Sequence, residues 1–309
     1  MTAQQIIKTE NIIRIRPDQT LSSALAKLST AHDAGFVFSA DKKFLGVISP
    51  YYCLIKSSYP ANAKVEHCLF HPPRLKVDYS IEKIAELLIE SKVHYLPIFS
   101  QDEQFLGIIS ARRLLTQFHD SPIFHVKIEE ILRMKNAPLI SVYEDDSIGT
   151  ALTIFKKSKI SKLIVVDKNL KLKGILSYFD LVHYLISPKN SEHRGERVGD
   201  RTNFYHQKVR NFAKSYVLTL SKDKYLNEAA RLIIDKRIGS VVVVDKARHP
   251  IGIITTRDFL RLLIRRINGQ RFEVMTKNLS HKSRQIIGGF FHRFSNFSHK
   301  TRSVAVKRN

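Results

Sequence analysis

The sequence predicts an α/β (α+β) fold built from four copies of one unit, ordered strand, helix, strand, strand, helix. The first observation is a repeated motif of a glycine, two apolar residues and a serine or threonine, beginning at Gly46, Gly107, Gly174 and Gly252. The second is that a β-rich apolar run and a polar turn precede each glycine. The third is an amphipathic helical pattern before each run. Repetition of this order along the chain indicates a repeat architecture.

Each copy contains the same elements in the same order. An extended piece ending in an acidic turn opens the copy, and a helix with apolar residues three and four apart follows it. The four expected helices begin near Leu21, Ile81, Ile148 and Leu226. The apolar runs that we expect to form the second strands are residues 36–38, 95–99, 163–166 and 241–244. The glycine motif then gives the third strand and leads into a closing helix.

The fourth copy reads Gly252-Ile253-Ile254-Thr255-Thr256-Arg257-Asp258 and then continues into an apolar helix. With its apolar run, polar turn and Ser/Thr-x-x-Asp step, it resembles the cystathionine-β-synthase (CBS) domain family. The resemblance covers about residues 8–266 and implies two tandem pairs, 8–120 and 125–266. In that family each pair of repeats is related by a pseudo-two-fold axis and leaves two clefts. These clefts commonly bind AMP, ATP or S-adenosyl compounds.

An adenosine ligand needs a carboxylate for its ribose diol, hydroxyls and positive charge for its phosphate, and a slot for its base. In the fourth copy the resemblance assigns Asp258 to the diol and Thr255 and Arg257 to the phosphate. In the third copy it assigns Asp180 to the diol and Ser177 to the phosphate, with Phe179 in place of the arginine. The other predicted ligand-binding residues flank the two clefts and are Thr219, Ile238, Gly239 and Ser240 for the fourth copy, and Ser141, Ile160, Ser161 and Tyr178 for the third.

The first two copies depart from this pattern. Tyr52 in the first copy and Arg113 in the second occupy the position of the aspartate. We therefore expect the first pair to be a structural or partner-binding platform, although Arg113 could instead face a phosphate. A second interpretation also applies to Asp180 and Asp258, because either could serve only as a cap at the start of its helix.

The chain is strongly basic, with a formal net charge of +23 and a pI near 10.0. Such a charge indicates partners such as nucleic acid, an anionic membrane surface or an acidic protein, unless it reflects a basic proteome. Residues 268–309 are expected to form a short basic β-α-β segment, with strands at 271–275 and 303–307 around a helix at 279–297. Phenylalanines alternate with cations there, which is compatible with nucleic-acid binding or with a helix whose phenylalanines pack inward. The candidate nucleic-acid contacts are Arg271, Lys277, Lys282, Arg284, Arg293, Lys300 and Arg302.

Other classes of site and location are not expected. Two cysteines are too few for a disulfide framework and fit a reducing cytoplasm. No signal peptide or membrane span is predicted. His67 and His71 flank two prolines, so we expect no metal site, and no catalytic constellation or Walker loop stands out. Residues 187–215 are expected to form a mobile loop followed by a short basic helix at 203–214.

The sequence therefore predicts a cytoplasmic regulatory protein, not an enzyme, that uses no cofactor and senses AMP, ADP, ATP or S-adenosylmethionine through its second pair. Self-association through the pairs is expected. Two alternatives remain open: a nucleic-acid- or ribosome-associated protein that uses the basic C-terminal segment, and a regulatory subunit of a separate enzyme or transporter.

Overall fold

The computed structural model describes residues 3–28, 34–135, 138–186 and 199–264, and for residues 199–202 it describes the backbone only. The chain divides into one unit of residues Met1–Arg265 and another of residues Arg266–Asn309. The predicted strands at 271–275 and 303–307 and the predicted helix at 279–297 lie outside the described residues. Residues 187–198 of the expected loop also lie outside the described residues, whereas residues 199–202 are helical.

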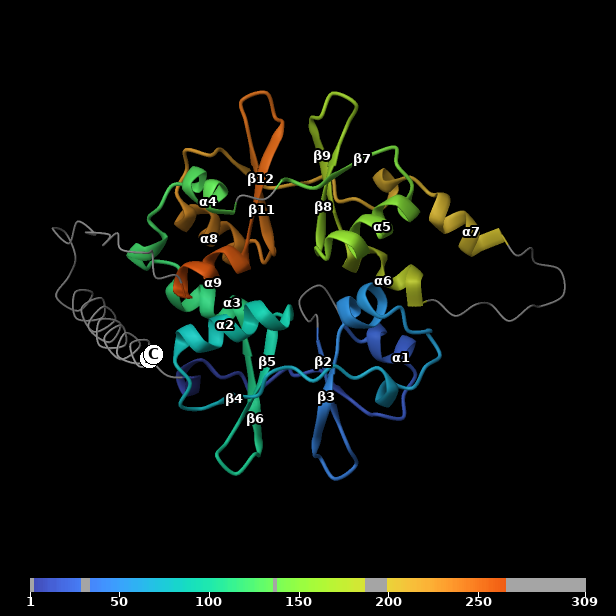
Figure 1. The fold of residues 1–309 in the computed structure, drawn as a ribbon, viewed down its shortest axis with the longest axis vertical. Helices are drawn as coiled ribbons and strands as arrows, with labels where there is room; N and C mark the ends of the chain where they lie inside the picture. The colour runs from blue at the N-terminus through green and yellow to red at the C-terminus, as the bar shows by residue number, and fades with distance from the viewer. Residues whose placement is uncertain (1–2, 29–33, 136–137, 187–198, 265–309) are drawn as a thin grey trace, which may run out of the picture. The chain divides into compact units, whose positions relative to one another are not determined.

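Four three-stranded sheets confirm the predicted repeat (Figure 1). In each sheet the first strand runs parallel to the second, and the second and third form an antiparallel hairpin. The strands are β1 (Arg14–Ile15), β2 (Gly35–Phe38) and β3 (Phe44–Ile48) in the first copy; β4 (Leu75–Lys76), β5 (Tyr95–Phe99) and β6 (Phe105–Ser110) in the second; β7 (Ser141–Tyr143), β8 (Lys162–Val166) and β9 (Leu172–Ser177) in the third; and β10 (Thr219–Leu220), β11 (Ser240–Val244) and β12 (Pro250–Thr255) in the fourth.

Two helices belong to each copy, one between the first two strands and one after the third. They are α1 (Leu21–Ala26) and η2 (Tyr51–Lys56), α2 (Ile81–Ser91) and α3 (Ala111–Phe118), α5 (Ile148–Ser158) and α6 (Tyr178–Ile186), and α8 (Leu226–Asp235) and α9 (Thr256–Ile264). Thr20, Ser80 and Ser147 start α1, α2 and α5, because each hydroxyl accepts a backbone N–H of the first turn.

The core explains why the repeats come in pairs. Side chains of the first two sheets pack on each other, among them Phe36, Phe44 and Phe99. The third and fourth sheets meet in the same way through Ile164 and Val242. A larger cluster gathers the apolar faces of the helices from all four copies. The burial of these faces is the main force that holds the repeats together.

Helices from the two pairs pack against each other between the sheets (Figure 1). In the second and fourth copies, α2 and α3 contact α9, and α3 also contacts α8. In the first and third copies, α1 contacts α6, and η2 contacts both α5 and α6. Each copy of one pair therefore has a defined counterpart in the other.

The repeated glycine has a steric cause. The segment that leads into one repeat crosses the third strand of its paired repeat, and the glycine lies at the crossing. A Cβ on Gly107 would lie 2.5 Å from the carbonyl oxygen of Lys8, and one on Gly174 would lie 2.9 Å from that of Lys214. A Cβ on Gly46 would lie 3.1 Å from the carbonyl oxygen of Phe70. Only glycine leaves room for this approach.

Three elements differ from the sequence-based expectation. The closing helix of the first copy, η2, is a π-helix, in which the Ser57 N–H donates to the Tyr52 carbonyl. The helix expected at 203–214 is observed as α7 (Gly199–His206), because residues 208–210 leave the helix and bond to the turn after β7. Helix α4 (Ile128–Lys135), which leads into the third copy, was not predicted. None of the described helices is long and apolar enough to cross a membrane.

Candidate functional site

The carboxylate of Asp258 lies at the start of α9 in the fourth copy, with its side chain only 2% exposed. Its Oδ2 atom accepts hydrogen bonds from the Thr255 N–H at 2.8 Å and the Thr255 hydroxyl at 3.0 Å. The Lys135 ammonium lies 3.0 Å from the same oxygen, and the Arg261 guanidinium lies 3.3 Å from Oδ1. Asp258 is thus a buried helix-capping carboxylate that also holds two cations.

Asp180 occupies the same position in the third copy. Its Oδ2 atom accepts the Ser177 N–H at 2.8 Å, and the Lys214 ammonium lies 3.0 Å from its Oδ1. The Ser177 hydroxyl donates to the Ser161 carbonyl at 3.2 Å, which joins two of the predicted site residues. The capping role and the proposed ligand role therefore fall on the same two carboxylates. Capping uses Oδ2, and the other oxygen of each carboxylate faces a cation.

The sequence reasoning missed the two lysines. Lys135 precedes the third copy and contacts Asp258 of the fourth, whereas Lys214 precedes the fourth copy and contacts Asp180 of the third. Aligned on the repeats, Lys135 lies six residues before Ser141 and Lys214 lies five residues before Thr219. The similar positions of the two lysines can be seen in the sequence. Only the structure shows that the lead-in segments cross, so that each lysine reaches the carboxylate of the paired repeat.

The residues predicted to edge the base meet around Lys162, which begins β8. Its ammonium donates to the Ser240 hydroxyl at 3.0 Å, and a Cβ on Gly239 would lie 2.6 Å from that ammonium. Lys162 directly follows Ser161 of the third copy. Because Lys162 contacts Ser240, the third and fourth copies meet at this point. The structure thereby brings Gly239 and Ser240 of the fourth copy to the ammonium of Lys162, a cation that the sequence did not single out.

Burial, and after it the positive charges of Arg112, Lys214 and Arg257, lower the pKa of Lys162 to about 8. Asp180 acts in the opposite direction. An excess of cations therefore surrounds this ammonium. Such an environment favours an anionic group nearby, because an anion would relieve the repulsion among the cations.

We expect Lys162→Met to be more stable than the wild type below pH 8, by about 1–2 kcal/mol after allowing for solvent. The folded pKa of Lys162 lies below the ordinary value of 10.5. The unfolded chain thus binds more protons between pH 8 and 10.5, and the wild type gains stability relative to the variant as the pH rises through that window. Urea unfolding across this range measures the difference, with exposed Lys171→Met as the control. The same change of unfolding free energy with pH in the wild type and in Lys162→Met would contradict the prediction.

Two arginines at equivalent positions link the pairs. The Arg257 guanidinium donates to the Lys92 carbonyl at 3.0 Å, at the end of α2. Its counterpart in the second copy, Arg112, donates to the carbonyls of Ile233 and Ile238, both at 2.9 Å, at the end of α8. Arg257 therefore caps a helix of the other pair, and contact with a phosphate stays a prediction for this residue.

The first two copies lack the carboxylate for different reasons. In the first copy the Tyr52 ring stacks on Phe70 with centroids 3.8 Å apart, and its hydroxyl donates to the Ser91 carbonyl at 2.5 Å. Burial raises the pKa of this phenol. In the second copy Arg113 is exposed, and its backbone N–H donates to the Ser110 hydroxyl, which caps α3. Neither side chain offers a carboxylate to a diol.

The remaining predicted residues differ in their exposure and contacts. Thr219 pairs with Val242 across the sheet, and Ser141 is exposed on β7. Ile160 and Ile238 are half-buried. Tyr178 is buried in the helical core, where its ring stacks on Phe179. Ligand contact stays a prediction for all of these residues.

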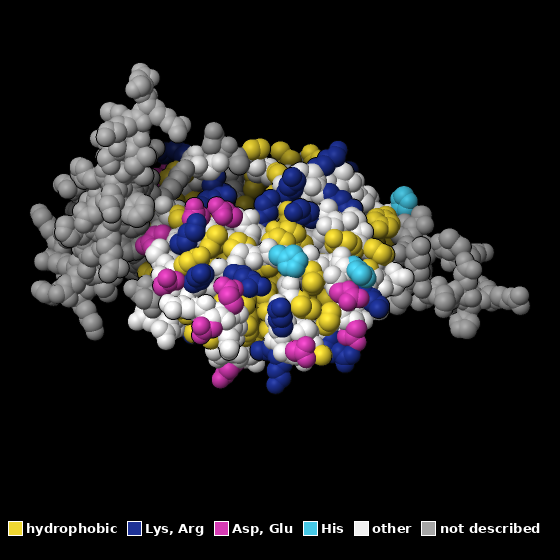
Figure 2. Space-filling view, turned by 60° about the horizontal axis from the view of Figure 1, so that its bottom comes forward, with side chains coloured by type: hydrophobic (Ala, Val, Ile, Leu, Met, Phe, Trp, Pro, Cys, Tyr) yellow, Lys and Arg dark blue, Asp and Glu magenta, His cyan; other side chains and the backbone are white. Residues whose placement is uncertain are grey.

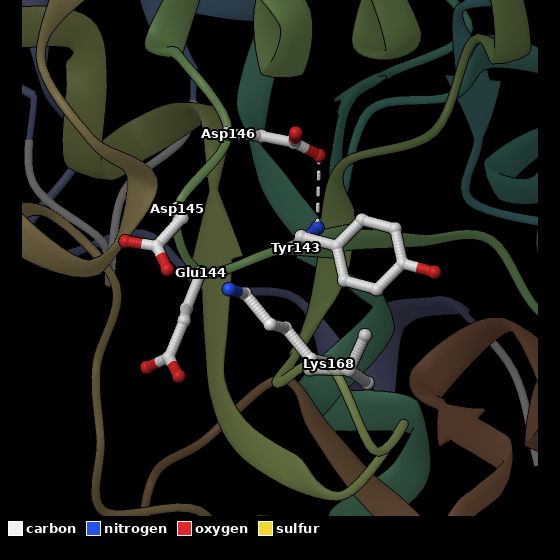
Figure 3. A pocket seen from close by; sticks show the side chains of 6 residues that line it. Tyr143, Glu144, Asp145, Asp146 and Lys168 are labelled. Atoms are coloured by element: carbon white, nitrogen blue, oxygen red, sulfur yellow. Dashed lines mark hydrogen bonds between the residues drawn. The ribbon is translucent and has the colours of Figure 1, made fainter.

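A cavity of about 340 Å³ lies elsewhere, around the turn that follows β7 (Figure 3). It is lined by Tyr143, Glu144, Asp145, Asp146, Val166 and Lys168. The Tyr143 N–H donates to Asp146 at 3.0 Å, and Asp145 pairs with Lys208 and Arg210. These acidic residues already serve the turn and its neighbours, so we do not assign the ligand to this cavity.

Within the described ranges, no cluster of three His, Cys, Asp or Glu side chains could hold a metal ion. Cys53 and Cys68 are buried free thiols. The face seen in Figure 2 carries Lys and Arg side chains interspersed with acidic and hydrophobic ones. All seven candidate nucleic-acid contacts belong to residues 271–302, outside the described residues.

Comparison with known proteins agrees with this architecture. A protein of Methanocaldococcus jannaschii, MJ1225, which was proposed as an archaeal homologue of γ-AMPK, superposes with a TM-score of 0.71 at 19% identity. The superposition covers 84% of this chain and 99% of that one. This likeness shows the fold.

Curated relatives match at the sequence level. An uncharacterized protein of M. jannaschii, MJ1404, is 24% identical over 278 residues, which cover 87% of this chain and 63% of that protein. The pig 5'-AMP-activated protein kinase subunit gamma-3 is 27% identical over 185 residues, which cover 57% of this chain and 35% of that protein. The chain thus spans less than two thirds of the length of these relatives.

The model of the CBS domain matches three segments, residues 69–120, 128–187 and 209–265, which together make up more than half of the chain. These segments contain the second, third and fourth sheets, and the structure adds a first sheet of the same topology. The chain belongs to the CBS domain family.

Proposed function

We propose that this chain is a regulatory protein whose third and fourth repeats bind an adenosine nucleotide. Asp258 and Asp180 would accept the ribose hydroxyls, one carboxylate in each cleft. The observation that carries the proposal is the equivalence of these two carboxylates, each in the first turn of the closing helix, with side chains 2% and 11% exposed, and each paired with a lysine. Tyr52 and Arg113 take the same position in the first pair, which therefore acts as a platform.

The charge around the clefts favours a nucleotide over S-adenosylmethionine. Lys162 lies among Arg112, Lys214 and Arg257, whose positive charges lower its pKa. A phosphate would lessen that repulsion, whereas a sulfonium would increase it. The gamma-3 subunit of 5'-AMP-activated protein kinase, with which this chain shares 27% identity, carries AMP in its name. AMP is therefore the first ligand to test, followed by ADP and ATP.

Ligand occupancy would be transmitted to the first pair. Arg257 stands next to Asp258 in the chain and donates to the Lys92 carbonyl of the second copy. A phosphate that attracts this guanidinium would weaken that bond and favour a different arrangement of the pairs. The output would be a separate enzyme or transporter bound to the protein. A cytoplasmic location and self-association through the pairs belong to the same proposal.

The test is calorimetry on the full chain with AMP, ADP, ATP and S-adenosylmethionine, each at the same ionic strength. We expect the nucleotides to bind and S-adenosylmethionine to bind at least about tenfold more weakly, because of the unfavourable charge. Absence of binding by every nucleotide would contradict the proposed function. Equal or tighter binding of S-adenosylmethionine would overturn the argument from charge.

A further inference from the structure

The third strand of each repeat carries one carbonyl group that receives the lead-in segment of the paired repeat. At Val47, Ile108 and Ile175 a backbone N–H of the lead-in donates to this carbonyl, from Phe70, Lys8 and Lys214 respectively. Each of these contacts is a reciprocal backbone bridge. Backbone bridges of this kind fix the lead-in independently of its side chains.

In the fourth repeat a side chain reaches this position. The equivalent carbonyl, that of Ile253, accepts the Lys135 ammonium at 2.5 Å. The same ammonium lies 3.0 Å from Asp258 Oδ2, so one lysine holds both the strand and the cleft carboxylate. Its side chain is 21% exposed, against 60% for Lys214.

Helix α4 presents this lysine to the cleft. Leu132 lies one turn before Lys135 on the same helical face and packs where a Cβ on Gly252 would lie. At the other end of the helix, where α4 starts, the N–H groups of Ile128 and Glu129 donate to the carbonyls of Lys224 and Lys222. The start of α4 is therefore tied by its backbone, whereas its end is tied to β12 by Leu132 and the Lys135 ammonium.

We propose that Lys135 is a latch that a ligand displaces: its ammonium holds Asp258, and a ribose diol that binds Asp258 releases this ammonium together with the end of α4. Two hydroxyl donors and an ammonium compete for the same carboxylate oxygens. Lys214 competes for Asp180 in the third copy, but its backbone bridge to Ile175 keeps that lead-in in place. This inference rests on the proposed function.

The first measurement is AMP affinity for Lys135→Met in an Asp180→Asn background, which leaves a single cleft to titrate. If the latch is closed about nine-tenths of the time, removing it tightens binding about tenfold. Lys135→Arg keeps the charge and should bind as weakly as the parent. Lys208→Met removes an exposed ion pair with Asp145 outside the clefts and serves as the matched control. Unchanged or weaker binding by Lys135→Met would overturn the latch.

The second measurement is amide hydrogen exchange in the protein with both clefts intact. Saturating AMP should speed exchange at the end of α4 and leave residues 208–214 unchanged, and Lys135→Met should show the faster exchange without ligand. Exchange that slows in α4 on AMP binding would contradict the proposal.

A third measurement separates the latch from the proposed function. If the wild type binds no nucleotide, a double-mutant cycle in urea unfolding with Lys135→Met and Asp258→Asn decides alone. If the two variants lower the free energy of unfolding non-additively, the contact between Lys135 and Asp258 is supported. If their effects add, the contact is overturned.

Discussion

We expect Asp258→Asn, in an Asp180→Asn background, to bind AMP about 100-fold more weakly than the Asp180→Asn parent. A carboxylate accepts both ribose hydroxyls in charge-assisted bonds, each worth about 1.5–3 kcal/mol, and the amide offers one neutral oxygen in its place. Asparagine keeps the shape of the side chain and can still accept the Thr255 N–H that caps α9. Calorimetric titration with AMP measures the change.

The matched control is Asp245→Asn. Asp245 is an exposed aspartate that caps the β11–β12 turn by accepting the His249 N–H, away from Asp258. We expect this variant to bind AMP as the parent does. Thermal unfolding of each variant shows whether the fold persists. A folded Asp258→Asn protein with undiminished affinity would show that Asp258 is a helix cap and no more.

Gly107→Ala is expected to lower the free energy of unfolding by about 2–3 kcal/mol. The added Cβ would lie 2.5 Å from the Lys8 carbonyl oxygen and 3.0 Å from the Ile7 side chain. The nearest atom belongs to the backbone of the crossing lead-in segment, which is itself bridged to Ile108. It cannot move aside without breaking that bridge. Urea unfolding with linear extrapolation gives the difference.

Gly149→Ala is the matched control for this prediction. Gly149 lies in α5, and a Cβ there would meet its first neighbour, the Tyr205 carbonyl oxygen, at 3.4 Å, an ordinary contact. We expect no loss of stability and a gain of up to about 1 kcal/mol, because alanine favours the helix. Equal losses at the two glycines would contradict the steric account of the repeat.

The predictable part of the fold depended on local patterns. The glycine motif, the apolar runs and the helical spacing are set by neighbouring residues, so they predicted the four sheets and their order. The bounds of α7 and the helix α4 were not recovered, because both helices lie in lead-in segments whose ends are fixed by the paired repeat. The Lys208 bridge to Ser147, for example, stops α7 from continuing.

The candidate site shows the same limit. Asp258 and Asp180 stood out because each belongs to a short motif that repeats along the chain. Lys135 and Lys214 did not, because each acts on a carboxylate of the other repeat, 123 residues away for Lys135 and Asp258. Lys162 likewise did not stand out, because the charges of Arg112 and Arg257 that lower its pKa come from helices distant in the chain. Charges assembled by crossing segments cannot be read from local spacing.

The stoichiometry of AMP binding tests the central claim most directly. Native mass spectrometry of the full chain with AMP counts bound molecules for the wild type, Asp180→Asn, Asp258→Asn and the double variant. The account predicts two AMP molecules per wild-type chain, one for each single variant and none for the double variant. Two molecules retained by the folded double variant, or none bound by the wild type, would contradict it.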